Sequence, residues 1–247
     1  MRVKAANHTK NKSAIKWRCH EPLRLETFSD AVFAFAVTLI IVSLEVPKSF
    51  NELFETMKGT VSFAACFATL FLIWNSQNLF FRRYGLNDAW TVALNGMLLF
   101  VVLVFAYPLK FLFGLLFSFS DQTYIINGQV HSVISDIQIP TLMSTYGAGY
   151  TVIYLLFYLM YANAGNRADE LKLNATELYE TQTIAYLNLI CACIGITAIL
   201  LAWLLPIGYS GLSGFFYFMI PITYFFWLGY RGKKAKKKFG LNELQVS

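Results

Sequence analysis

The chain has 247 residues, of which 57% are hydrophobic, 17% aromatic and only 14% charged. This composition is too apolar for a soluble domain of this size, so it predicts an integral membrane protein. The formal net charge is +6, with basic residues clustered beside apolar segments. Such clusters are typical of membrane topology and of contacts with anionic headgroups. We therefore expect the lipid bilayer as a partner, and no nucleic acid.

Six apolar windows run through the chain, each close to the roughly 20 residues that a membrane-spanning helix requires. They cover residues 30–47, 59–81, 89–117, 144–164, 181–205 and 211–230. The sequence therefore predicts an all-α integral membrane protein with six transmembrane helices per subunit. We expect three parts: a basic N-terminal segment over 1–23, a six-helix transmembrane domain over 24–230, and a basic tail over 231–247.

Most lysines and arginines lie on one predicted side of the membrane. They are found in the N-terminal segment, at Arg82 and Arg83, at Arg167 and Lys172, and in the tail from Arg231 to Lys238. The opposite side carries only Lys48, Lys58 and Lys110. The positive-inside rule therefore predicts a multi-pass cell-membrane protein with both termini in the cytoplasm, as an even number of spans requires.

The connections between the windows carry weaker signals. Residues 48–58 have apolar side chains at helical spacing and suit a short interfacial helix. Asn127-Gly128 lies between two apolar pairs and allows a small hairpin in the loop over 118–143. Residues 165–180 are charged and favour helix, so we expect them to extend the fifth helix into the cytoplasm.

The first window begins with the string Arg-x-x-x-Phe-Ser-Asp, formed by Arg24, Phe28, Ser29 and Asp30. Ionisable groups this close to hydrocarbon are costly unless they are paired or hydrated. Arg24 lies nearly two turns before Asp30, which favours a partner on another helix or subunit. In the alternative, Ser29 or Asp30 caps the helix while Arg24 extends to lipid headgroups. If Arg24 and Asp30 instead belong to a buried hydrogen-bond network, the natural partners in it are Asn75, Gln77, Asn78 and Asn95.

One face of the same helix forms a stripe when residues are placed at about 100° intervals. Its members are Ala31, Phe35, Thr38, Leu39, Val42 and Glu45. Stripes of this kind usually serve helix packing or lipid contact. Thr38 and Glu45 are unusual in such a stripe. Glu45 is either a solvated helix end or one member of a carboxylate ring that concentrates cations.

The string Arg-x-x-x-Phe-Ser-Asp resembles the signature of the transmembrane protein 175 family, the endolysosomal potassium channels and their prokaryotic relatives. Trp74 is similar to that family's Trp-x-x-His, although Gln77 stands at the histidine position. Asn95 and Pro108 are similar to its Leu-Asn and late-proline pattern. The resemblance covers most of residues 20–110 and identifies the chain as a prokaryotic member of that family.

The resemblance implies a potassium-permeable cation channel in which the first helices of four six-helix repeats surround the ion path. The first-helix string occurs once here, so the chain holds one repeat and the resemblance implies a homotetramer. Phe35, Leu39 and Val42 then fall at the hydrophobic constriction, and Thr38 in a hydroxyl layer that selects potassium. Two departures are that Gln77 cannot titrate and that Phe35 is bulkier than the expected aliphatic residue.

Other functional classes find little support in the sequence. The three histidines lie outside the apolar windows, and no acid–base pair, metal cluster or cofactor motif appears, so we expect neither an enzyme nor a bound cofactor. The segment Thr145-Tyr-Gly-Ala-Gly-Tyr150 lacks the order of a carbonyl selectivity filter and predicts small-residue helix packing. The alternative to a channel is a small secondary transporter or a non-conducting membrane scaffold, in which the first-helix stripe is a helix interface.

Overall fold

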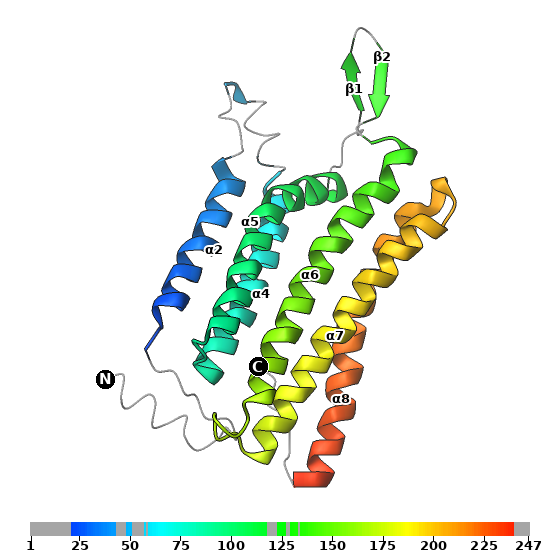
Figure 1. The fold of residues 1–247 in the computed structure, drawn as a ribbon. Helices are drawn as coiled ribbons and strands as arrows, with labels where there is room; N and C mark the ends of the chain where they lie inside the picture. Colours follow the sequence, from blue (N-terminus) through cyan, green and yellow to red (C-terminus); the bar gives the residue numbers. More distant parts are fainter. Residues whose placement is uncertain are drawn as a thin grey trace.

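The computed structural model describes residues 21–42, 48–50, 57, 59–117, 123–126, 129–132 and 134–239. Six long α-helices run through this part of the chain (Figure 1), which confirms the predicted all-α, six-helix fold. They are α2 (Arg24–Val42), α4 (Thr60–Tyr84), α5 (Ala89–Phe117), α6 (Ile139–Asn166), α7 (Ala175–Leu204) and α8 (Met219–Phe239).

Five stretches of the described chain are long and apolar enough to cross a membrane. They are Thr60–Tyr84, Ala89–Phe117, Asp136–Asn166, Ala175–Leu204 and Tyr209–Phe239. Helix α2 is not among these five, and its first two turns carry Arg24, Glu26 and Asp30. The charged start of α2 therefore needs polar partners or water.

The helices form two groups that meet along α5 and α6. In the first group α2 packs against α4 and α5, and in the second α7 packs against α6, α8 and the 3-10 helix η2 (Ile207–Phe218). Helix α5 bends in its upper part (Figure 1), as expected from the proline at position 108, which lacks a backbone donor. The Tyr146 hydroxyl of α6 donates to the Pro108 carbonyl at 2.7 Å and so joins the two groups at the bend.

Local sequence explains where several helices begin and end. Helix α4 ends at Tyr84 and is capped by Gly85, whose left-handed φ of 60° causes no strain in glycine. The Gly85 N–H donates to the Phe81 carbonyl at 2.7 Å. Helix α7 begins after Asn174, whose N–H donates to the Glu177 carboxylate at 2.9 Å in a capping box. This cap starts the helix at Ala175, so the expected extension over 165–180 is wrong for the residues between α6 and α7.

The glycine-rich segment 145–150 lies inside α6 and is helical. A Cβ added to Gly149 would overlap the Phe105 ring of α5, and one added to Gly147 would overlap Ile199 of α7. The two glycines therefore let neighbouring helices approach closely, which confirms the predicted role of this segment in helix packing.

The last apolar window differs from its prediction. The window over 211–230 begins as the 3-10 helix η2, and α8 continues beyond it to Phe239. Glycine and serine weaken α-helix in this stretch, and the Ser213 hydroxyl bonds to the Ser210 carbonyl at 2.7 Å. The basic residues after position 230 therefore lie on a continuous helix.

A small hairpin is present between α5 and α6. Strands β1 (Thr123–Ile126) and β2 (Gln129–Ser132) pair antiparallel with Ile126 opposite Gln129. The hairpin prediction is confirmed, although Asn127 and Gly128 lie outside the described residues. Most of the expected interfacial helix over 48–58 also lies outside them.

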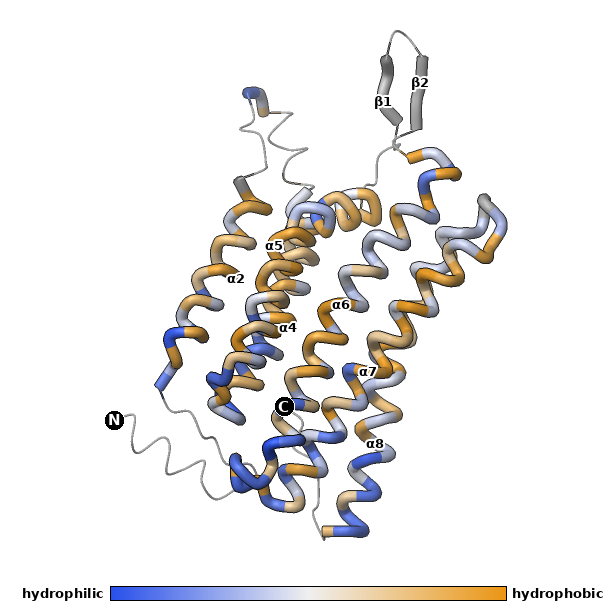
Figure 2. Tube along the Cα trace, in the orientation of Figure 1, coloured by the Kyte–Doolittle hydropathy of each residue, from blue (hydrophilic) through white to orange (hydrophobic). Residues whose placement is uncertain are grey.

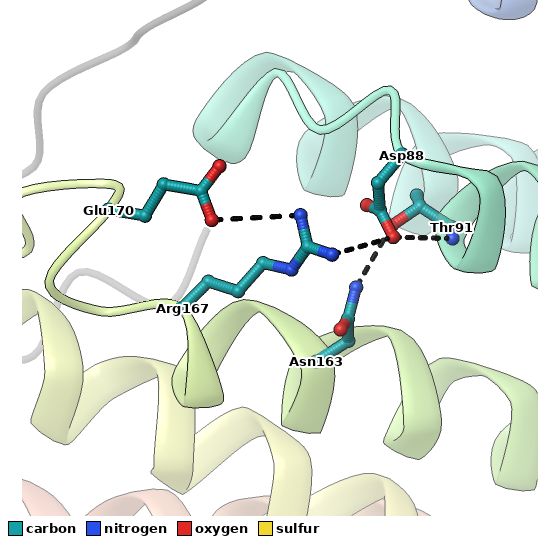
Figure 3. Close-up of polar contacts among 5 residues, drawn as sticks. All are labelled: Asp88, Thr91, Asn163, Arg167 and Glu170. Carbon is teal, nitrogen blue, oxygen red and sulfur yellow. Dashed lines mark hydrogen bonds and ion pairs between the residues drawn. The ribbon is translucent and has the colours of Figure 1, made fainter.

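A polar cluster ties the start of α5 to the end of α6 (Figure 3). Asp88 accepts hydrogen bonds from the Thr91 hydroxyl at 2.6 Å and the Thr91 N–H at 3.3 Å. The Arg167 guanidinium lies 3.2 Å from the same carboxylate and 3.7 Å from Glu170, and the Asn163 amide donates to the Thr91 hydroxyl at 3.1 Å. Asp88 therefore caps one helix and forms an ion pair with the next.

The surroundings of Asp88 favour its charged form. Burial alone would raise the pKa of this carboxyl, but the Thr91 hydrogen bonds and the Arg167 guanidinium outweigh it and hold the pKa below its ordinary value. A carboxyl with a lowered folded-state pKa contributes stability above its unfolded-state pKa of about 3.9. That stability is lost as the pH falls through the folded-state pKa.

Replacement of Asp88 tests this cluster. We expect Asp88→Asn to lower the melting temperature at neutral pH, because asparagine retains the cap but not the ion pair. The difference from the unchanged protein should shrink as the pH falls below about 4 and then through the lowered folded-state pKa of Asp88. Melting curves in detergent across pH measure this. Arg167→Gln is the matched partner, and full additivity of the two changes would contradict the pairing.

Candidate functional site

The two faces of α2 have different surroundings. Phe33, Ala36 and Ile40 are buried and belong to the core that α2 shares with α4 and α5. On the opposite face, Phe35 is 56% exposed and Leu39 is 43% exposed. Helix α2 therefore has one face packed against its own subunit and an opposite face that is exposed among the described residues.

The exposed face carries the predicted stripe. Ala31, Phe35, Thr38 and Leu39 are all exposed, and they follow one another at the spacing of one helix face. Val42 continues the backbone of α2, but its side chain and the whole of Glu45 lie outside the described residues. The structure thus brings Phe35, Thr38 and Leu39 together on one accessible surface.

The hydroxyl of Thr38 has a defined orientation. It donates to the Ala34 carbonyl one turn earlier at 2.8 Å. Because the proton points to the helix backbone, the lone pairs of the oxygen are available on the exposed face. Among the neighbouring side chains of this face, Phe35 and Leu39 offer only carbon. Thr38 therefore supplies an electron-rich oxygen within an apolar surface, which is an arrangement suited to a partly dehydrated cation.

A buried chain of hydrogen bonds joins the start of α2 to α5 and α4. The Asn95 amide donates to the Ser29 hydroxyl at 3.0 Å, and the Gln77 amide donates to the Asn95 carbonyl oxygen at 2.8 Å. Ser29 in turn donates to the Leu25 carbonyl at 2.8 Å. Ser29 and Asn95 are 0% exposed and Gln77 is 2% exposed, so water does not compete for these groups. The network therefore determines which face of α2 turns inward.

Asp30 has a different partner from the one that its charge suggests. The Trp74 indole N–H donates to the Asp30 carboxylate at 2.6 Å. Arg24 is exposed and forms no ion pair with Asp30 within the described subunit, because nearly two helical turns separate them. Asp30 therefore has its partner on another helix, α4, as the spacing of Arg24 and Asp30 predicted, and that partner is Trp74 and not Arg24.

The capping alternative is also not what the subunit shows. Helix α2 begins at Arg24, so Ser29 and Asp30 lie in its second turn. The capping interaction at this end comes from Glu26, whose carboxylate accepts from the Leu23 N–H at 3.2 Å. A glutamate in the first turn is a recognisable sequence signal for such a cap.

Other motif residues take no part in the network. Asn75 and Asn78 are half-buried, and their side chains form no hydrogen bond within the described part of the chain. Phe28 is 61% exposed. In the same part of the chain, no group of three or more His, Cys, Asp or Glu side chains is arranged to bind a metal ion.

Two polar contacts at the same end of the bundle were not foreseen from the sequence. The first is the Asp88 cluster described above. The second joins the Tyr84 hydroxyl of α4 to the Thr181 hydroxyl of α7 at 2.8 Å. The capping signal Asp-x-x-Thr at 88–91 was available in the sequence. No local pattern indicates that Tyr84 meets a residue 97 positions away.

The buried network leads to a prediction for Asn95. Asn95→Ala removes the acceptor of the buried Gln77 amide, and an unsatisfied buried donor costs about 1–3 kcal/mol. We expect a clear loss of thermal stability in detergent. The control is Asn75→Ala, which removes a half-buried amide without a hydrogen bond in the described chain and should change stability by about 0.5 kcal/mol or less. Equal effects of the two changes would show that the network does not hold α2.

Known proteins resemble this chain over most of its length. The sequence model described as "Endosomal/lysosomal potassium channel TMEM175" matches residues 24–106. A Marivirga tractuosa protein named "Potassium channel" is 36% identical over 221 residues, covering 85% of this chain and 88% of the relative. A protein of Chamaesiphon minutus, also named as a potassium channel, is 26% identical over 172 residues, covering 65% of this chain and 74% of the relative.

Solved structures agree with this assignment. A crystal structure of a variant of the potassium channel MtTMEM175, in complex with a Nanobody-MBP fusion protein, has a TM-score of 0.75 at 34% identity. It covers 87% of this chain and 96% of the other. The lysosomal potassium-selective channel TMEM175 homolog from Chamaesiphon minutus shares the fold with a TM-score of 0.51 at 20% identity, covering 80% and 96%. These relatives are named as channels and not as enzymes, and the chain belongs to the TMEM175 family.

Proposed function

We propose that the chain is one subunit of a potassium-permeable cation channel in which the α2 helices line the ion path. The observation that carries this proposal is the exposed α2 face, with Phe35, Thr38 and Leu39 directed away from a well-packed subunit. The relatives named as potassium channels support it. One α2 helix cannot enclose a path, so copies of the chain must assemble, and the four-repeat architecture of the family favours a homotetramer.

In this proposal the path narrows at an apolar constriction. Phe35, Leu39 and Val42 recur at the spacing of one helix face, so four subunits would place rings of carbon around the axis. Apolar constrictions control conduction because water and ions leave them when they are narrow. The constriction would admit potassium and other monovalent cations only when it is wetted.

Selectivity in this proposal comes from the Thr38 layer, without a carbonyl filter. Four Thr38 oxygens, with their protons directed to the Ala34 carbonyls, would face an ion that has lost part of its hydration shell. Glu45 would lie beyond the constriction at the mouth of the path, where a carboxylate ring raises the local concentration of cations. No resident metal or cofactor is required, because the cation is the transported substrate.

We also propose that the protein lies in the cell membrane with both termini in the cytoplasm. The start of α2 and the end of α8 lie at the same end of the bundle (Figure 1). Hydrophilic residues gather at that end, while the middle of the helices is apolar (Figure 2). The positive-inside rule then assigns that end to the cytoplasm. Residues 24–230 would form the channel domain, between basic segments at 1–23 and 231–247.

Ion flux through the purified protein tests this function directly. Reconstituted in liposomes, the protein should carry potassium passively down its gradient, without a proton or sodium gradient. Liposomes without protein are the baseline. Flux that requires a second coupled ion would indicate a secondary transporter, and absence of flux from correctly assembled protein would indicate a scaffold.

Thr38→Val tests the hydroxyl layer. The change is nearly isosteric but removes one oxygen per subunit, so we expect a lower preference for potassium over sodium with assembly intact. Reversal potentials under bi-ionic conditions measure this preference. The matched control is Thr69→Val on α4, because Thr69 also donates to a carbonyl one turn earlier, at 2.9 Å, but lies outside α2. An unchanged reversal potential for Thr38→Val would remove Thr38 from selectivity.

Leu39→Ala tests the constriction. A smaller side chain lowers the cost of wetting an apolar ring, so we expect higher conductance or open probability with little change in stability. Single-channel recording and thermal melting together measure the two effects. The control is Ile40→Ala, which opens a cavity in the core and should cost about 2–5 kcal/mol of stability without raising conductance. The same behaviour from both variants would mean that Leu39 is an ordinary packing residue.

A further inference from the structure

Helix α8 carries an open apolar groove on its outer face. The groove has a volume of ≈ 400 Å³ and is lined by Met219, Ile222, Thr223, Phe226, Trp227 and Tyr230. The α8 span is also the least packed of the five, with 6% of its apolar window buried against 22–44% for the others. A long apolar surface of this helix is therefore open to the surroundings of the subunit.

Lysines continue the same face beyond the groove. At about 100° per residue, Lys233 and Lys237 fall in line with Phe226 and Tyr230, whereas Lys236 and Lys238 fall on the flanks. The lysines at 233, 234, 236, 237 and 238 are all exposed. Ala235, on the opposite side, is 1% exposed, which sets the rotation of the helix. The apolar groove and the lysines at 233 and 237 thus form one continuous strip along α8.

Arg231 and Trp227 hold this strip in place. The Arg231 guanidinium lies 3.9 Å from the centre of the Tyr179 ring, and its Nε donates to the Thr183 hydroxyl at 2.9 Å. The Trp227 indole N–H donates to the Thr183 carbonyl at 3.0 Å. These contacts attach the basic end of α8 to α7. The arginine is occupied inside the subunit, while the lysines of the strip face outward.

We propose that this strip binds an anionic phospholipid. One acyl chain lies in the groove, and the phosphate headgroup lies between Lys233 and Lys237. The order of features along α8 matches the order of groups in a phospholipid. The apolar groove comes first, then Tyr230 with its polar hydroxyl, and then the lysines. A second copy that packed its own α8 against this strip would bring like-charged lysines together, which disfavours α8-to-α8 pairing as the occupant.

Native mass spectrometry of the purified full chain tests the proposal, with phosphatidylglycerol and phosphatidylcholine of identical acyl chains as probes. We expect tighter binding of phosphatidylglycerol. A membrane-proximal lysine contributes roughly 1 kcal/mol, so Lys233→Gln with Lys237→Gln should weaken phosphatidylglycerol binding about 25-fold. The matched control, Lys236→Gln with Lys238→Gln, removes the same charge from the flanks and should have a much smaller effect.

Two further variants complete the test. Lys233→Arg with Lys237→Arg keeps the charges and should retain the preference for phosphatidylglycerol. Thr223→Trp fills the groove and should weaken both lipids. If the double variant at Lys233 and Lys237 and the double variant at Lys236 and Lys238 lost the same affinity for phosphatidylglycerol, the lysines would attract the lipid only diffusely, without a defined site. That result would overturn the proposal. So would equal binding of the two lipids, or unchanged lipid binding by the Thr223→Trp variant.

Discussion

The buried hydrogen bonds from Ser29 through Asn95 to Gln77 are the constraint on which the rest of the site depends. In an apolar surrounding, a polar group without a partner is costly, so these three side chains specify one rotation of α2 against α4 and α5. Phe33 and Ile40 follow Ser29 on the inward face and are buried. The opposite face of α2 therefore points away from the subunit, where its residues can line an ion path or contact another subunit.

Contacts between the two groups of helices support this arrangement. The Asp88 cluster and the contact between Tyr84 and Thr181 tie the first group of helices to the second at one end, while the bend at Pro108 joins them further along. The second group has no direct part in the proposed path. Its last helix instead presents a groove and lysines on its exposed side, so in our proposal one half of the subunit would conduct and the other half would face lipid.

Patterns within one segment were readable from the sequence, whereas pairings between segments were not. Apolar length predicted six helices, 3.6-residue spacing predicted a stripe on one face of the first helix, and Asn127-Gly128 indicated the hairpin. The partner of Asp30 depends on which side chain of a neighbouring helix reaches it, and the indole of Trp74 does so instead of Arg24. The 3-10 helix at 207–218 replaced part of a predicted α-helix. The Asp88–Arg167 pair joins residues 79 positions apart. Helix rotation and crossing decide such contacts, and neither has a local signature.

The most direct test of the central claim is the access of a water-soluble, charged methanethiosulfonate reagent to single cysteines in the assembled, conducting protein. The background carries alanine at all four native cysteines. Leu39→Cys should react, and the reaction should block potassium flux, because the side chain faces an aqueous path. Ala36→Cys, on the buried face, should not react. If Leu39→Cys does not react although flux persists, the face meets lipid or protein, and the account of α2 as the lining of the ion path is wrong.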